Sequence, residues 1–215
     1  QSKKREAMHR VLREDDIRQA RAVRGEVHRT DPPIGNVMLK QVFGGEAGLT
    51  LKASLERGWQ VGVPLDQQDG WDALQRTGRR QLQADLEAED PYLTTFSHPC
   101  GPWGAWSRFN LARGGAAAAT VLSAREATRP LVKLVNDTVL GRVQRGRHVL
   151  AEHPAASECW SQPECKDIQK LFNSNELYFC RADGCMLGYH DAESGLPNLK
   201  PMGFITDMVA AVGIF

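Results

Sequence analysis

The first apolar run that leads into a glycine-rich turn is VMLKQVFGGEAG, at residues 37–48. Its first seven residues are typical of a buried strand, and its glycines permit a tight turn and a close approach of the backbone to a ligand. Residues 49–56 follow directly and predict a helix whose amino end lies behind that turn. A strand, a glycine-rich turn and a helix in this order begin an α/β unit.

The same alternation of apolar runs and helical stretches continues along the chain. It predicts strands at residues 59–65, 92–97, 148–152, 176–180 and 200–206, and helices at 73–89, 116–145 and 162–172. Pro130 is expected to interrupt or kink the second of these helices, and residues 97–110 are expected to form a loop. Strands separated by helices imply a doubly wound, mainly parallel sheet, so the predicted fold class is Rossmann-like α/β.

The amino-terminal residues differ from the rest. Residues 1–30 hold nine Lys/Arg against five acids and lack Gly and Pro before Gly25, which predicts an exposed basic helix. Pro32 and Pro33 then mark a boundary. We therefore expect a basic helical linker at 1–34 and one α/β domain at 35–215, and we interpret the chain as a piece of a longer protein.

Composition limits the class of protein. The 215 residues include 27 Lys+Arg and 26 Asp+Glu, 41% are hydrophobic, and no run approaches the roughly eighteen apolar residues of a membrane helix. Five cysteines without a secretory signal favour a reducing, intracellular location, with the nucleus as a candidate compartment. The cysteine spacings match no common zinc pattern, and His98 and His153 are interpreted as packing or hydrogen-bonding residues, so no metal is predicted.

The near-zero net charge of +1 hides strongly charged blocks. Residues 108–147 carry eight Lys/Arg against two acids, whereas residues 66–90 carry seven acids against three arginines. The basic block favours a nucleic-acid partner, with Arg108, Arg113 and Trp103 as candidate contacts. A solvated helix face is the alternative explanation.

Two acidic residues follow the second predicted strand in positions that suit a nucleoside. Asp66 ends the second strand, where a carboxylate can accept hydrogen bonds from ribose hydroxyls, and Asp72 could reach an adenine amino group. A helix cap or a solvated turn is the alternative for each acid.

A thiol and a carboxylate follow the next two strands. Cys100 lies in the segment after residues 92–97, and Glu152 ends the strand at 148–152. A thiolate can add to carbon 6 of a pyrimidine while a carboxyl group at ring nitrogen 3 stabilises the charge, which makes carbon 5 nucleophilic. The pair therefore suits methyl transfer to a pyrimidine ring.

Together these motifs resemble a known family. VFGGEAGL at 42–49, Asp66, GWD at 70–72, Pro99-Cys100 and EHP at 152–154 resemble the motifs of S-adenosylmethionine-dependent cytosine-5 DNA methyltransferases. HPCGPWGAWSRFN at 98–110 and GRHVLAEHP at 146–154 resemble more closely a methyltransferase-like module of dinoflagellate retroelement polyproteins. The resemblance implies a class I methyltransferase fold, Cys100 as nucleophile and Glu152 as the base-orienting acid. It also implies S-adenosylmethionine bound by Phe43, Gly44, Gly45, Glu46, Gly48, Asp66, Asp72 and Pro99.

The chain also departs from that family. Gly101 and Pro102 follow Cys100 where Gln is usual, His153 and Pro154 follow Glu152 where Asn-Val is usual, and Gln41 replaces an acid. These departures leave open a catalytically degenerate methyltransferase fold that serves as a nucleic-acid-binding or assembly module of a retroelement polyprotein. A methyltransferase acting on RNA or a small molecule is a third reading.

Overall fold

The computed structural model of the chain describes residues 37–44, 48–187, 190, 193–197 and 199–212. The predicted basic helix and the linker boundary lie outside these residues. Among the described helices none is long and apolar enough to cross a membrane.

A five-stranded sheet in the order β1-β2-β3-β5-β4 forms the centre of the domain. Its strands are β1 (Leu39–Val42), β2 (Leu93–Phe96), β3 (His148–Pro154), β4 (Tyr178–Asp183) and β5 (Pro201–Thr206). The first three are parallel, whereas β5 is antiparallel to both β3 and β4. The α/β class is confirmed, but the sheet is mixed rather than mainly parallel. The described residues between β4 and β5 include the short 3-10 helix η5 (Gly184–Leu187) and no crossover helix, and β5 returns antiparallel to β4.

Residues 59–65, predicted to form a strand, make only two isolated backbone bridges with β1. Val61 and Leu65 form isolated parallel bridges with Leu39 and Val42. Pro64 lies between them and has no N–H to donate to a ladder, which explains why a regular strand does not form. The segment still lies alongside β1, on the side opposite β2.

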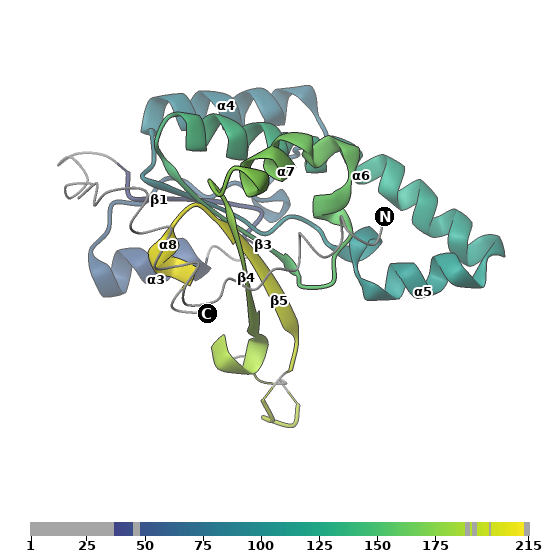
Figure 1. Cartoon of the computed structure of the whole chain (residues 1–215). Helices are drawn as coiled ribbons and strands as arrows, with labels where there is room; N and C mark the ends of the chain where they lie inside the picture. The colour runs from purple at the N-terminus through teal and green to yellow at the C-terminus, as the bar shows by residue number, and fades with distance from the viewer. Residues whose placement is uncertain (1–36, 45–47, 188–189, 191–192, 198, 213–215) are drawn as a thin grey trace.

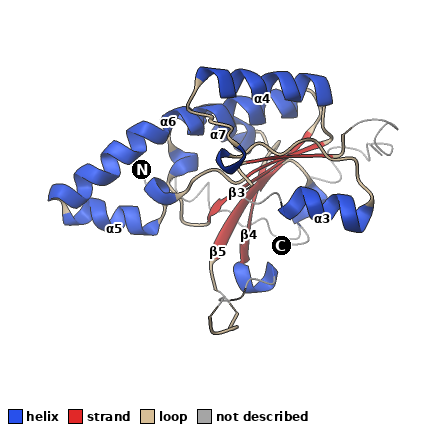
Figure 2. Ribbon diagram, turned by 180° about the vertical axis from the view of Figure 1, so that it is seen from behind, coloured by secondary structure: helices blue, strands red, loops and turns tan. Residues whose placement is uncertain are grey.

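Helices cover both faces of the sheet, as Figures 1 and 2 show. One face carries α4, α6 and α7, and the other carries α3 and α8. Their bounds are α3 Gly48–Arg57, α4 Arg76–Glu89, α6 Gly115–Gln144, α7 Lys166–Asn173 and α8 Val209–Val212. The larger core lies under α4, α6 and α7 and includes the fully buried Val135, Val139 and Val149. Burial of this apolar surface is the main force that holds the layers together.

A buried ion cluster joins β1 to α4. Lys40 is fully buried, and its ammonium group lies 2.8 Å from Glu89 and 3.1 Å from Asp85. A charge in this position is tolerated because two carboxylates pair with it.

The segment after β2 is more ordered than expected. Residues Gly101–Trp103 form a 3-10 helix, η2, and the helix α5 follows at Ala105–Arg113. Gly114 and Gly115, with φ of 70° and 56°, reverse the chain into α6, because glycine adopts positive φ without steric cost. The helix α6 runs through Pro130 without interruption; Pro130 lies on its exposed side. The pair of α5 and the first part of α6 projects from the body of the domain.

Candidate functional site

The site lies where the sheet changes its winding direction. After β1 the chain comes back to pair with one side of β1 at residues 61–65. It then crosses over to form β2 on the other side of β1. In open α/β sheets a ligand binds beyond the carboxyl ends of the strands at such a switch point. The predicted cofactor turn after β1 and the Cys100 segment after β2 both begin there.

Phe43 connects three of these strand ends. Its ring centroid lies 5.1 Å from that of Trp71 and 6.4 Å from that of His98. Its φ of 60° is a strained conformation for a residue other than glycine. Strain of this kind is found at functional sites, and here it turns the chain into the glycine-rich segment.

The turn after β1 is held by the side chain of Gln41. The amide nitrogen of Gln41 donates to the Gly44 carbonyl at 2.9 Å, and its amide oxygen accepts from the backbone N–H of Thr50 at 3.1 Å. A Cβ atom at Gly44 would overlap the Gln41 side chain, so a larger residue here would force Gln41 out of these contacts. Gly48 begins α3, while Gly45 and Glu46 lie outside the described residues. The turn is thus held by the neutral amide of Gln41, at a position where the methyltransferase family that the sequence resembles usually has an acidic residue.

The two acids proposed for the nucleoside make local turn contacts. Asp66 Oδ1 accepts from the Gln68 N–H at 3.0 Å and caps a 3-10 helix. Asp72 Oδ1 accepts from the Leu74 N–H at 2.8 Å. Both side chains therefore make the turn or cap contacts expected under the alternative interpretation. Both residues also lie at the predicted edge of the sheet, next to Trp71.

Cys100 is half-buried and begins the η2 turn. Its carbonyl accepts from the Trp103 N–H at 3.0 Å, and the hydroxyl of Ser107 donates to the Gly101 carbonyl at 2.6 Å. The thiol is therefore carried on a turn fixed from both sides.

Two charged residues, Arg125 and Glu158, hold this turn in place. Neither was predicted from the sequence. Arg125 of α6 donates to the Pro102 carbonyl at 2.9 Å and to Glu158 at 2.6 Å, and its guanidinium lies 5.0 Å from the Trp103 ring. The Glu158 N–H donates to the Trp103 carbonyl at 2.9 Å. No sequence signal marks this pair, because 33 residues separate Arg125 from Glu158.

Glu152 lies at the end of the neighbouring strand. The pairing of Phe96 with Ala151 puts the Cys100 segment and Glu152 at the same edge of the sheet. Glu152 Oε1 is buried without a hydrogen-bond partner among the described residues. Burial raises the pKa of Glu152, and the nearby charge of Lys200 opposes this rise. A raised pKa makes the neutral form of a carboxyl group easier to reach, and a neutral carboxyl group can donate a hydrogen bond, as the predicted role requires. No described hydrogen bond joins it directly to Cys100.

The predicted nucleic-acid contacts separate into buried and exposed residues. Trp103 is fully buried beneath Arg125, so the structure does not support its predicted contact with nucleic acid. Arg108 and Arg113 are exposed on α5. The same helix exposes 80% of Trp106 and 56% of Phe109, with Arg113 lying 5.8 Å from the Phe109 ring. Trp106 thus has the exposure that was expected of Trp103.

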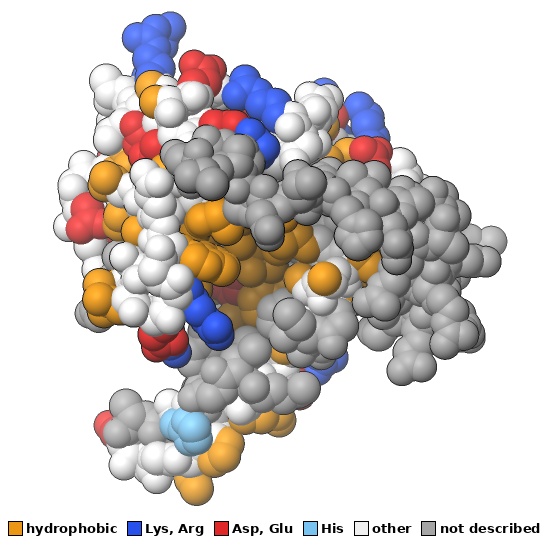
Figure 3. Space-filling view, turned by 90° about the vertical axis from the view of Figure 1, so that its left-hand side faces the viewer, with side chains coloured by type: hydrophobic (Ala, Val, Ile, Leu, Met, Phe, Trp, Pro, Cys, Tyr) orange, Lys and Arg blue, Asp and Glu red, His pale blue; other side chains and the backbone are white. Residues whose placement is uncertain are grey.

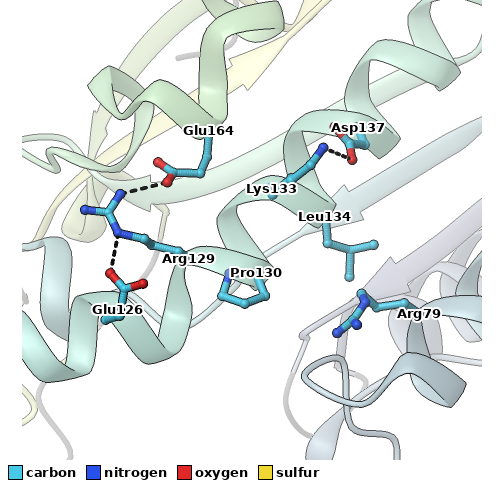
Figure 4. Close-up of a pocket in the computed structure, with 8 residues that line it drawn as sticks. All are labelled: Arg79, Glu126, Arg129, Pro130, Lys133, Leu134, Asp137 and Glu164. Atoms are coloured by element: carbon cyan, nitrogen blue, oxygen red, sulfur yellow. Dashed lines mark hydrogen bonds and ion pairs between the residues drawn. The ribbon is translucent and has the colours of Figure 1, made fainter.

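A groove of about 460 Å³ lies elsewhere, on the outer side of α6 (Figure 4). Arg129 at its edge pairs with Glu164 at 2.7 Å and with Glu126 at 3.0 Å, and Lys133 pairs with Asp137. Arg79, also at its edge, donates instead to the Ala73 and Leu74 carbonyls. The groove includes none of the predicted site residues. A second hollow, lined by hydrophobic side chains, opens on the side of the molecule that lies to the left in Figure 1 (Figure 3).

No protein-family model matches the chain, and no curated protein matches it. Among solved structures, it is similar to the crystal structure of S. pombe Dnmt2 methyltransferase, with a TM-score of 0.38 and 10% sequence identity. The match covers 80% of this chain and 49% of the other, so the chain spans about half the length of that protein.

Proposed function

We propose that this domain binds S-adenosylmethionine at the switch point and methylates carbon 5 of cytosine in DNA, with Cys100 as the nucleophile. The observation that carries the proposal is the convergence of Phe43, Trp71 and the Cys100 segment beyond neighbouring strand ends.

The residues around the first turn suit this cofactor. The amino end of α3 can bind the carboxylate of the methionine part, and the Phe43 ring offers a surface for a flat or cationic group. Asp66 and Asp72 stand near Trp71, where the nucleoside would lie, although both carboxylates would have to share or exchange their present turn contacts.

The two groups of the second half of the site have complementary roles. S-adenosylmethionine supplies an electrophilic methyl group. The Cys100 thiolate adds to carbon 6 of the ring, and Glu152, in its neutral form, donates a hydrogen bond to ring nitrogen 3. After methyl transfer the proton on carbon 5 is lost to a base, and Cys100 leaves as a thiolate. The clamp of Arg125 and Glu158 would keep Cys100 in place during both steps.

The exposed face of α5 would hold the nucleic acid. Arg108 and Arg113 can contact phosphates, and Trp106 and Phe109 can stack on bases or fill the gap left by an extruded base. DNA is the proposed partner, and an intracellular, nuclear setting is the corresponding location.

Isothermal titration with S-adenosylmethionine tests the first half of the proposal, and transfer of a labelled methyl group to cytosine-containing DNA tests the second. Cys100→Ala should abolish transfer and keep cofactor binding; Cys180→Ala, which changes a buried thiol on β4, is the matched control. Well-folded protein that does not bind the cofactor would overturn the proposal.

The second candidate is a degenerate methyltransferase fold that binds nucleic acid for a retroelement polyprotein. The turn contacts of Asp66 and Asp72, together with the exposed aromatic and basic residues of α5, favour it. It predicts DNA or RNA binding with a steep salt dependence that neither cofactor nor Cys100→Ala changes. A methyltransferase for RNA or a small molecule would instead bind the cofactor and transfer the methyl group to those substrates.

A further inference from the structure

Two histidines and a cysteine from three different segments meet in the interior of the domain. His98 follows β2, His153 lies in β3, and Cys159 begins the 3-10 helix η3 (Cys159–Ser161). All three are buried, and one ligand atom of each lies within 4.8 Å of the others. His98 Nε2 lies 3.3 Å from Cys159 Sγ, and the two imidazole rings stack with centroids 4.5 Å apart.

Several polar atoms of this cluster lack a partner. Nδ1 of His98 and both ring nitrogens of His153 are buried without a hydrogen bond of normal geometry among the described residues. A buried polar atom without a partner is unfavourable. The Pro99 carbonyl lies within reach of the His153 N–H, so the lone-pair nitrogen of His153 is the atom whose partner is missing. Each imidazole nitrogen with a lone pair can be satisfied by a metal ion.

We propose that His98, His153 and Cys159 bind one Zn²⁺ ion, with Cys165 as the fourth ligand. Nitrogen and sulfur ligands in a tetrahedral set are those that zinc prefers. With bonds of about 2.0–2.1 Å to nitrogen and 2.3 Å to sulfur, ligand atoms in such a set lie roughly 3.3–3.8 Å apart. The distance between His98 Nε2 and Cys159 Sγ, 3.3 Å, already has this value, and the ligand atoms of His98, His153 and Cys159 all lie within 4.8 Å of one another.

Cys165 is the neighbour that can close the site. It is fully buried in the 3-10 helix η4 (Pro163–Cys165), and its thiol is close enough to interact with that of Cys159. The surroundings of all four residues are protein, including the ring of Trp160, 5.4 Å from His98. A buried site without solvent fits a structural zinc ion, whose four ligands all come from the protein.

The rest of the surroundings fits the same site. A zinc-bound imidazole binds the metal through one ring nitrogen and keeps an N–H on the other. For His153 the Pro99 carbonyl lies within hydrogen-bond reach of the ring and can accept the N–H of the nitrogen that does not bind metal. On binding, Cys159 and Cys165 each release a proton to solvent and remain as thiolates held by the cation.

The consequence is a cross-link between three parts of the fold. The ion would fix the end of β2, two residues before Cys100, to the end of β3, next to Glu152, and to η3. The site therefore has a structural role that does not depend on the proposed methyl transfer.

Metal analysis of the purified, reduced protein tests the inference directly. We expect one Zn²⁺ per chain and, with Co²⁺ in its place, the absorption of a tetrahedral thiolate complex. His153→Ala and Cys159→Ala should each weaken zinc binding by more than the roughly 10–100-fold that the loss of an outer partner causes. Cys165→Ala should weaken binding and alter the cobalt spectrum. Cys180→Ala, another buried cysteine, is the matched control and should keep zinc.

Thermal unfolding provides a readout that tolerates unstable variants. Zinc should raise the Tm of the metal-free wild-type protein and of Cys180→Ala, and should leave that of Cys159→Ala unchanged. The inference is overturned if reduced, folded wild-type protein binds no zinc, or if the double variant His153→Ala/Cys159→Ala binds it as tightly as the wild type.

Discussion

The amide oxygen of Gln41 accepts hydrogen bonds from both the backbone N–H and the hydroxyl of Thr50, at 3.1 and 3.3 Å. The strand β1 and the first turn of α3 are thereby joined across the predicted cofactor turn. The contact is made by a neutral side chain that is almost completely buried.

Gln41→Ala should therefore loosen this turn. The change removes the hydrogen bonds to Thr50 and to Gly44 that Gln41 makes inside the domain. We expect a loss of about 1–3 kcal/mol in the free energy of unfolding, measured by urea denaturation, and weaker binding of S-adenosylmethionine. Lys52→Ala, an exposed change on α3, should alter neither quantity; equal effects of the two variants would contradict the role of Gln41.

Two glycines in helices should respond to alanine in opposite directions. A Cβ atom at Gly78 of α4 would overlap the Asp72 carbonyl, whereas one at Gly141 of α6 would meet nothing within 4 Å. Gly141→Ala should stabilise the protein by up to about 1 kcal/mol through helix propensity. Gly78→Ala should destabilise it by about 1–3 kcal/mol and disturb the hydrogen bond from Trp71 to the Gly78 carbonyl. Thermal unfolding of both variants gives the comparison, and a stabilised Gly78→Ala would show that the Asp72 turn gives way easily.

Alanine substitutions of the two tryptophans near Cys100, Trp103 and Trp106, should have different effects on stability and on DNA binding. Trp103→Ala should lower stability by about 3–5 kcal/mol, because a fully buried ring is replaced by a cavity under Arg125. Trp106→Ala should change stability by less than about 0.5 kcal/mol, since that ring is exposed. Fluorescence titration with labelled DNA should show weaker binding for Trp106→Ala at unchanged stability. If its affinity equals that of the wild type, α5 is not the nucleic-acid surface.

Asp90 should contribute to the loss of stability in acid. Hydrogen bonds and charge from Arg147, with a further contribution from Arg142, lower the pKa of Asp90 below its usual value of 3.8. The stabilisation is present at pH values above that of the unfolded group and is lost as the pH falls through about 4 and below. Asp90→Asn should thus lower stability at neutral pH and flatten its decline in acid.

The choice of asparagine isolates the charge at this position. Asp90 ends α4 with φ of 37°, a conformation that asparagine also tolerates, so the backbone should not be disturbed. Urea denaturation between about pH 3 and 7 measures both effects. An acid limb as steep as that of the wild type would show that other carboxylates dominate.

The local pattern of residues was sufficient to predict much of the fold. Apolar runs marked β1, β2, β3 and β5 within one or two residues at most ends, because strand and helix periodicity is a property of neighbouring residues. The local pattern gave a wrong prediction at residues 97–110. The prolines, glycines and tryptophans of 97–110 predicted a loop, yet α5 forms there and packs against α6.

The candidate site shows the same division. The sequence by itself determined that Phe43, Asp66, Cys100 and Glu152 lie at or after the ends of successive apolar runs, and parallel pairing brings such positions to one edge. Only the tertiary structure decided that Trp103 is buried and Trp106 exposed, that Arg125 reaches Glu158, and that His98 meets Cys159 across 61 residues of chain. Those contacts depend on how whole helices and strands pack, and packing is set by the combined burial of many side chains rather than by any local spacing.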